Sequence, residues 1–135
     1  MDTTKNKHSP TICAPISHGE LIDKISILEI KKERLVGSKL QNINKELESL
    51  KVLVDKSHLE IDVDLFSQLK QVNTNLWEIE DQIRIKEKNK EFDNEFIQLA
   101  RSVYKQNDMR ASIKREINQK YNSQLIEEKS YKKYQ

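Results

Sequence analysis

The sequence predicts an all-α fold, an antiparallel bundle of four helices built as two helical hairpins with a short C-terminal helical tail. Apolar residues recur at intervals of three and four through most of the chain, which is the period of a helix packed on one face. Both prolines fall within the first fifteen residues, so only Gly19 and Gly37 interrupt the rest. No stretch shows the alternation that is typical of a strand.

The composition predicts a narrow core. Hydrophobic residues make up 36% of the chain and charged residues 34%, whereas an average domain is roughly 45–50% apolar and about 25% charged. The 135 residues are enough for one domain. We expect a disordered leader over residues 1–15, a helical bundle domain over 16–121 and a charged tail over 122–135.

The first hairpin is predicted from a cap and a break. Ser17 and Glu20 form a capping box at the start of the first helix, which should run to about Val36 and stop at Gly37 in the left-handed conformation. This helix is apolar on two sides, so it is either central or shared with another subunit. The second helix starts near Ser38. Its heptad seam consists of Leu40, Ile43, Leu47, Leu50 and Val54.

The second hairpin is predicted from two helix caps and a short turn. Asp62 or Asp64 caps the third helix and Asp93 caps the fourth. Because the turn between them is short, the two helices should be antiparallel, which places Arg110 about level with Asn73. The seam of the third helix is Leu65, Leu69, Val72, Leu76, Ile79 and Ile83, and the apolar face of the fourth is Phe96, Leu99, Ala100, Val103, Ala111, Ile117 and Tyr121.

Three polar residues interrupt the apolar face of the fourth helix at its centre: Asn107, Arg110 and Lys114. A buried charge without a partner costs several kcal/mol, so these groups should pair, face a wet cavity or bind a ligand. Acids on the first and third helices opposite bases on the fourth predict interhelical ion pairs. The alternative is a site for a carboxylate or phosphate held by Arg110 and Lys114. The candidate cluster is Glu29, Lys32, Asn73, Glu80, Asn107, Arg110 and Lys114.

Other chemistry has little support, and no catalytic residue is assigned. Neither a nucleophile elbow nor a phosphate loop is present. The pair Glu20 and Asp23, like the pair Glu78 and Asp81, has a spacing that can hold magnesium, but the capping box claims the first pair and the second points away from its seam. The three histidines lack metal-ligand spacing. We therefore predict no cofactor and no metal site, and the pattern favours a protein that is not an enzyme.

Charge and composition restrict the partners. The net charge is +2, and the +5 carried from Arg101 onward is too small, with too few aromatic residues, for nucleic-acid binding. No run approaches the ~20 apolar residues of a membrane span. A single cysteine, Cys13, and no signal peptide predict a cytoplasmic protein. Apolar surface left over by a thin bundle predicts a homodimer or another protein partner.

Three segments resemble an uncharacterised family of small helical proteins from bacteria and their phages, a domain of unknown function. They are SHGELIDKISILEIKKERL (17–35), NTNLWEIEDQIRIKE (73–87) and FDNEFIQLARSVYKQNDMRASIKREIN (92–118). The resemblance implies a complete single-domain protein in which Asp108 and Arg110 belong to the family pattern. Members lie alone or near genes for sugar transfer and surface polysaccharides.

These observations predict a non-enzymatic helical interaction or assembly protein. The alternative is a protein or enzyme that binds a small anionic ligand, such as a sugar nucleotide or a phosphate, in the polar interhelical cluster. The resemblance adds a role as an accessory to surface-polysaccharide synthesis.

Overall fold

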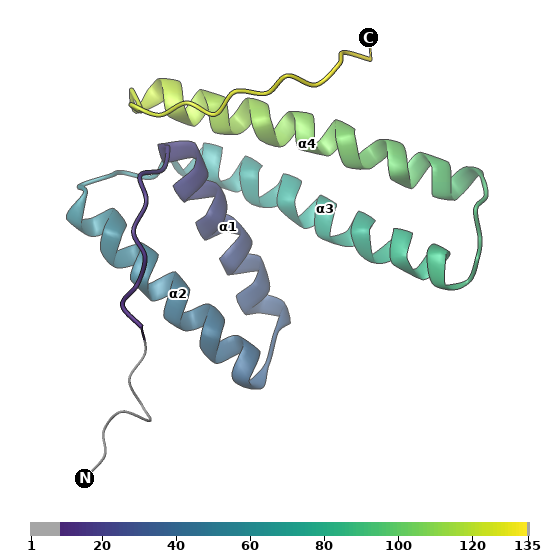
Figure 1. The fold of residues 1–135 in the computed structure, drawn as a ribbon, viewed down its shortest axis with the longest axis horizontal. Coiled ribbons are helices and arrows are strands. Elements are labelled where there is room, and N and C mark those ends of the chain that lie inside the picture. The colour runs from purple at the N-terminus through teal and green to yellow at the C-terminus, as the bar shows by residue number, and fades with distance from the viewer. Residues whose placement is uncertain (1–8, 135) are drawn as a thin grey trace.

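The computed structural model describes residues 9–134 and contains four helices arranged as two hairpins (Figure 1). This architecture confirms the all-α bundle. Residues 1–8 of the predicted leader lie outside the described residues, and residues 9–17 contain no helix. The helices are α1 (His18–Arg34), α2 (Gly37–Lys56), α3 (Val63–Lys88) and α4 (Asn94–Lys120).

Side-chain caps begin three of the helices. Ser17, Asp62 and Asp93 each accept a hydrogen bond from the backbone amide three residues further on, at 2.9 to 3.1 Å. Each bond satisfies an amide that has no partner within its helix. Asp62, and not Asp64, is therefore the cap of α3, and the predicted starts of α1, α3 and α4 are confirmed.

Gly37 forms the turn between α1 and α2. Its φ angle is +65°, the left-handed conformation that the sequence predicts for it. Helix α1 ends at Arg34, two residues before the predicted end, because Leu35 and Val36 are extended. Gly37 then opens α2.

Helix α1 is central, as its two apolar sides predict. Within residues 9–134 it is the one helix whose backbone lies beside each of the other three, whereas α2 lies beside α1 alone. The two sides of α1 bury two separate clusters of apolar side chains. One joins α1 to α3 and α4 and the other joins it to α2: Ile22, Leu65, Leu69, Val72, Ile113 and Ile117 in the first, and Leu21, Ile25, Leu28 and Leu47 in the second.

Helices α3 and α4 continue past α1 as a two-helix arm, which we define as residues 79–104 (Figure 1). In this part no other helix of the described residues covers the seams of α3 and α4, and the C-terminal segment reaches only the inner end, at Val103 and Tyr104. No residue from Thr74 to Ser112 is buried, although the seam residues among them are half-buried. A pair of helices has no third element over its seam, which explains the difference from the base of the hairpin.

The segment 122–134 after α4 is extended and runs back along that helix (Figure 1). The prediction of a helical tail is wrong. Asn122 has a positive φ of 51°, which turns the chain, and the Ser123 hydroxyl donates to the Leu125 carbonyl at 2.7 Å. The segment docks at its far end, where the ring of Tyr134 packs edge-on against Tyr104 with centroids 4.9 Å apart.

None of the helices formed by the described residues combines the length and the apolar character that a bilayer crossing requires.

Candidate functional site

A buried ion pair joins α1 to α4. The Asp23 carboxylate is 1% exposed and binds Arg110 in a bidentate way, with Nε to Oδ1 at 3.0 Å and Nη2 to Oδ2 at 2.5 Å. Asn73 of α3 donates from Nδ2 to Asp23 Oδ1 and to Ser26 Oγ, both at 2.9 Å. The bonds to Asp23 raise the pKa of Arg110 above its ordinary value. Three helices thus share one carboxylate.

Lys114 forms a second centre one helical turn further along α4. Its side-chain amine is nearly buried and donates to Glu20 Oε2 at 2.8 Å and to Glu127 Oε2 at 2.7 Å. Burial lowers the pKa of Lys114, but the hydrogen bonds to Glu127 and Glu20 outweigh it, and the net shift is upward. Lys114 is therefore a charged ammonium group that requires these carboxylates.

Glu127 lies between two ammonium groups. Its Oε2 accepts from Lys114, and its Oε1 is 2.9 Å from Nζ of Lys129. The bonds from Lys114 and then Lys129 lower the pKa of Glu127 to about 2. This carboxylate comes from the extended segment after α4 and holds that segment to the helix.

The beginning of α1 is pressed against the end of α4. The Gly19 amide donates to Asn118 Oδ1 at 2.7 Å, and the His18 amide donates to Ser123 Oγ at 3.2 Å. A Cβ atom at Gly19 would lie 2.5 Å from the backbone oxygen of Lys114. The glycine therefore permits the close approach that brings Glu20 and Asp23 to the bases of α4.

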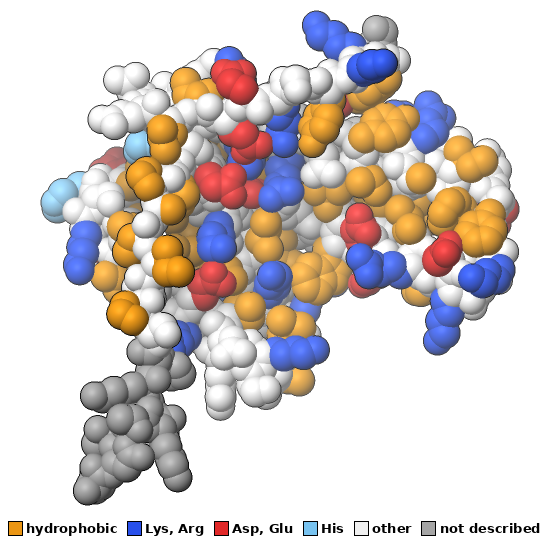
Figure 2. Space-filling view, viewed as in Figure 1, with side chains coloured by type: hydrophobic (Ala, Val, Ile, Leu, Met, Phe, Trp, Pro, Cys, Tyr) orange, Lys and Arg blue, Asp and Glu red, His pale blue; other side chains and the backbone are white. Residues whose placement is uncertain are grey.

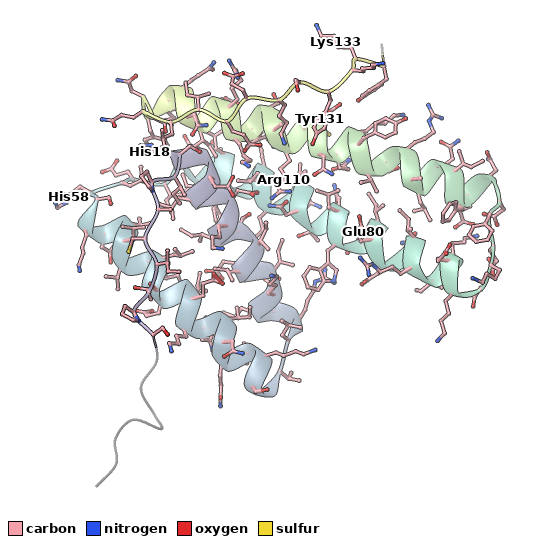
Figure 3. The ribbon with its side chains drawn as sticks, in the orientation of Figure 1. His18, His58, Glu80, Arg110, Tyr131 and Lys133 are labelled. Atoms are coloured by element: carbon pink, nitrogen blue, oxygen red, sulfur yellow. The ribbon has the colours of Figure 1, made fainter. Side chains whose placement is uncertain are left out.

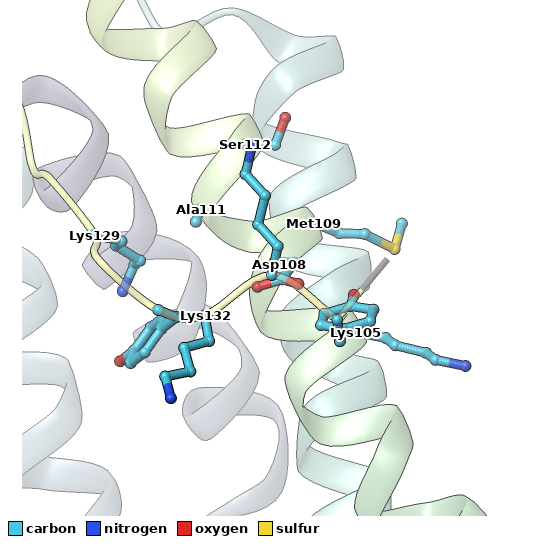
Figure 4. A pocket seen from close by; sticks show the side chains of 10 residues that line it. Lys105, Asp108, Met109, Ala111, Ser112, Lys129 and Lys132 are labelled. Carbon is cyan, nitrogen blue, oxygen red and sulfur yellow. The ribbon is translucent and has the colours of Figure 1, made fainter.

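A polar pocket of about 330 Å³ opens beside these two centres, between α4 and the segment 122–134. Larger pockets continue from it under the same segment (Figure 4). Figure 3 shows Arg110 where α4, α1 and α3 come together. The walls of the polar pocket are Glu20, Asn107, Arg110, Ala111, Lys114, Glu127 and Lys129.

Four of the seven predicted site residues lie in this region. Asn73, Arg110 and Lys114 belong to the hydrogen-bonded network, and the exposed Asn107 lines the pocket. The predicted level of Arg110 with Asn73 is confirmed, because both side chains bind the same carboxylate.

The structure does not bring the other three predicted residues to this region. Glu29 faces α2 and pairs with Lys51 at 3.4 Å, and Lys32 is exposed. Glu80 lies further out on α3 than Asn73 and pairs with Arg84 at 3.8 Å (Figure 3). The expected acids on α3 are replaced by acids on α1 and on the C-terminal segment.

Four residues of the network escaped the sequence reasoning: Glu20, Asp23, Asn118 and Glu127. Asp23 stands on the second apolar side of α1, in line with Ile27 and Ile30, which is the signal that could have placed it in an interface. The amide of Glu20 is capped by Ser17 as expected, but its carboxylate reaches Lys114. No periodic pattern in the extended segment marks Glu127.

Together the fold and the network define a small all-α protein in which the C-terminal segment supplies one carboxylate, Glu127, to a charge network between helices. The chain belongs to a family of unknown function, DUF6165, whose model matches residues 12–134. Searches of curated proteins and of solved structures found no match.

The network satisfies its own hydrogen bonds. Every buried side-chain nitrogen and oxygen among the described residues has a hydrogen-bond partner. Interhelical ion pairs exist as predicted, but their acids are Asp23 and Glu20 of α1 and not Glu29 and Glu80. Glu127 of the C-terminal segment adds a third acid. That these residues bind a ligand stays a prediction.

Proposed function

We propose that the protein is a helical assembly protein and that the α3–α4 arm pairs with the arm of a second copy. The observation that carries the proposal is the absence of any buried residue from Thr74 to Ser112. This stretch holds the outer half of the seam of α3 and the outer half of the apolar face of α4. Helices in water gain most of their stability from packing an apolar face, and one partner helix leaves these seams half covered.

Large apolar side chains on the arm support this proposal. Ile85, Phe92 and Ile97 are 58%, 55% and 51% exposed. Figure 2 shows hydrophobic side chains spread between charged ones over this end of the molecule. Single exposed apolar residues are common, but several on one arm whose seam is itself only half-buried are typical of an interaction surface.

A second copy of the chain fits the arm better than a strongly charged partner. Residues 79–104 carry six acidic and five basic side chains, so the arm is almost neutral. Charge repulsion between two arms is therefore weak. Four antiparallel helices from two hairpins form a standard bundle. Within one chain, α1 packs over the inner end of the α3–α4 hairpin. In the dimer, the arm of the second copy would pack over the outer end.

Sedimentation velocity of the full chain tests the proposal. We expect a species of about twice the 16.0 kDa chain mass for the natural sequence. Ile97→Glu places a charge among the exposed apolar side chains of the arm, where the second copy would bury it, and should shift the protein to the monomer. Ile12→Glu is the matched control, because Ile12 is 97% exposed on the N-terminal segment, and it should leave the mass unchanged.

A natural sequence that sediments as a monomer at every concentration contradicts the proposal. So does a dimer that Ile97→Glu and Ile12→Glu leave equally intact. Circular dichroism of each variant shows whether the helices are retained.

A further inference from the structure

We propose that the polar pocket between α4 and the C-terminal segment is a binding site for a small organic anion, whose carboxylate or phosphate replaces the Glu127 carboxylate on Lys114 and Lys129. The C-terminal segment then occupies its own ligand site when no ligand is present. This inference is independent of the pairing of the arms.

The first argument is the coordination of Glu127. Its two oxygens each meet a different ammonium group, Lys114 at 2.7 Å and Lys129 at 2.9 Å. This is the arrangement that binds a carboxylate or phosphate of a ligand through charge-assisted hydrogen bonds. Lys114 is only 7% exposed, and a buried ammonium group must keep an anion beside it. A replacement for Glu127 must therefore also be an anion.

The second argument is that Glu127 is weakly anchored compared with the other acids. Glu20 and Asp23 are fixed on α1, whereas Glu127 belongs to an extended segment. In the described part of the chain, no backbone–backbone hydrogen bond joins residues 124–134 to a helix. The Glu127 side chain is 36% exposed, so it can leave Lys114 for water without unfolding a helix.

The third argument is the room beside the carboxylate. The pocket of about 330 Å³ has Arg110 in its wall, and the two hydrogen bonds of Arg110 to Asp23 use Nε and Nη2. A neighbouring pocket of about 610 Å³ shares Asn107 and Lys129 with it. Tyr104, Tyr131 and Tyr134 line that second pocket, so the uncharged part of a ligand would lie against aromatic rings. Both volumes are in the range of small-molecule sites.

Isothermal titration calorimetry of the full chain, at constant ionic strength, tests the site with glucose 1-phosphate and citrate as probes. Glu127→Gln removes the competing carboxylate and should bind at least one probe about tenfold more tightly than the natural chain. Glu128→Gln is the matched control. It removes the same charge from the adjacent residue, which pairs with Arg115 at 3.4 Å, and should bind like the natural chain.

A cation variant completes the test. Lys129→Gln, made together with Glu127→Gln, should weaken binding about tenfold. Lys45→Gln removes an exposed lysine of α2 and should leave binding unchanged. The probe that binds more tightly distinguishes a phosphate site from a carboxylate site. If neither probe binds Glu127→Gln, or if Glu127→Gln and Glu128→Gln strengthen binding equally, the proposal is overturned.

Discussion

Asp23 is the most enclosed charged side chain among the described residues, and three helices depend on how it is neutralised. A buried carboxylate is tolerated because Arg110 supplies a bidentate counter-ion and Asn73 supplies a further donor. Such a pair adds little net stability compared with apolar residues of similar volume, but breaking one half leaves an uncompensated charge. Its role is therefore to fix the rotation of α1 against α4.

Arg110→Met should lower the free energy of unfolding by about 3 kcal/mol, because it leaves the Asp23 carboxylate buried without a cation. The double variant Asp23→Leu with Arg110→Met should recover most of that loss. Arg84→Met is the control, since Arg84 pairs with Glu80 at the surface, and it should change stability by less than about 0.5 kcal/mol. Urea denaturation measures all three. A double variant as unstable as Arg110→Met would show that Asp23 is held for another reason.

At the scale of the element, the contact between α1 and α4 depends on the absence of a side chain at Gly19. In an open helix, alanine is more favourable than glycine by roughly 0.5–1 kcal/mol. At Gly19 a Cβ atom would instead meet the backbone oxygen of Lys114 at 2.5 Å and Asn118 Oδ1 at 3.0 Å. The backbone of α4 cannot rotate away as a flexible side chain can.

Gly19→Ala should therefore destabilise the protein by about 1–3 kcal/mol, because it overpacks the contact between α1 and α4. Ser112→Ala, on the exposed face of α4, should be neutral or slightly stabilising, as alanine favours a helix. Thermal unfolding of both variants checks the signs. A stabilised Gly19→Ala protein would contradict the close approach of the two helices.

Local signals and long-range contacts differed in how well the sequence predicted them. Ser17 and Asp93 cap helices through their own neighbours, so spacing along the chain was enough to predict them. For α3 the spacing left Asp62 and Asp64 open, and the structure selects Asp62.

The partner of Arg110 depends on the rotation of α1, which no single helix determines. The acids expected in the cluster were Glu29 and Glu80, and Arg110 binds Asp23 instead. Glu127 was missed because an extended segment has no period to analyse.

At the scale of the whole molecule, the chain divides into a base with a buried core and an arm without one. The base holds every buried apolar side chain of the described residues, gathered around α1. The arm has the same kind of seam and no α1 to cover it. A second arm would complete the packing that the seam of α3 and the apolar face of α4 imply.

Amide hydrogen exchange of the full chain, at two protein concentrations about a hundredfold apart, tests this pairing most directly. Association slows the exchange only of those amides whose local structure it stabilises. We predict that the amides of residues 79–88 and 94–104 become more protected at the higher concentration. The amides of α1 should change much less. Arm protection that is the same at both concentrations, or a change confined to α1 and α2, would contradict the assembly of the protein through its α3–α4 arm.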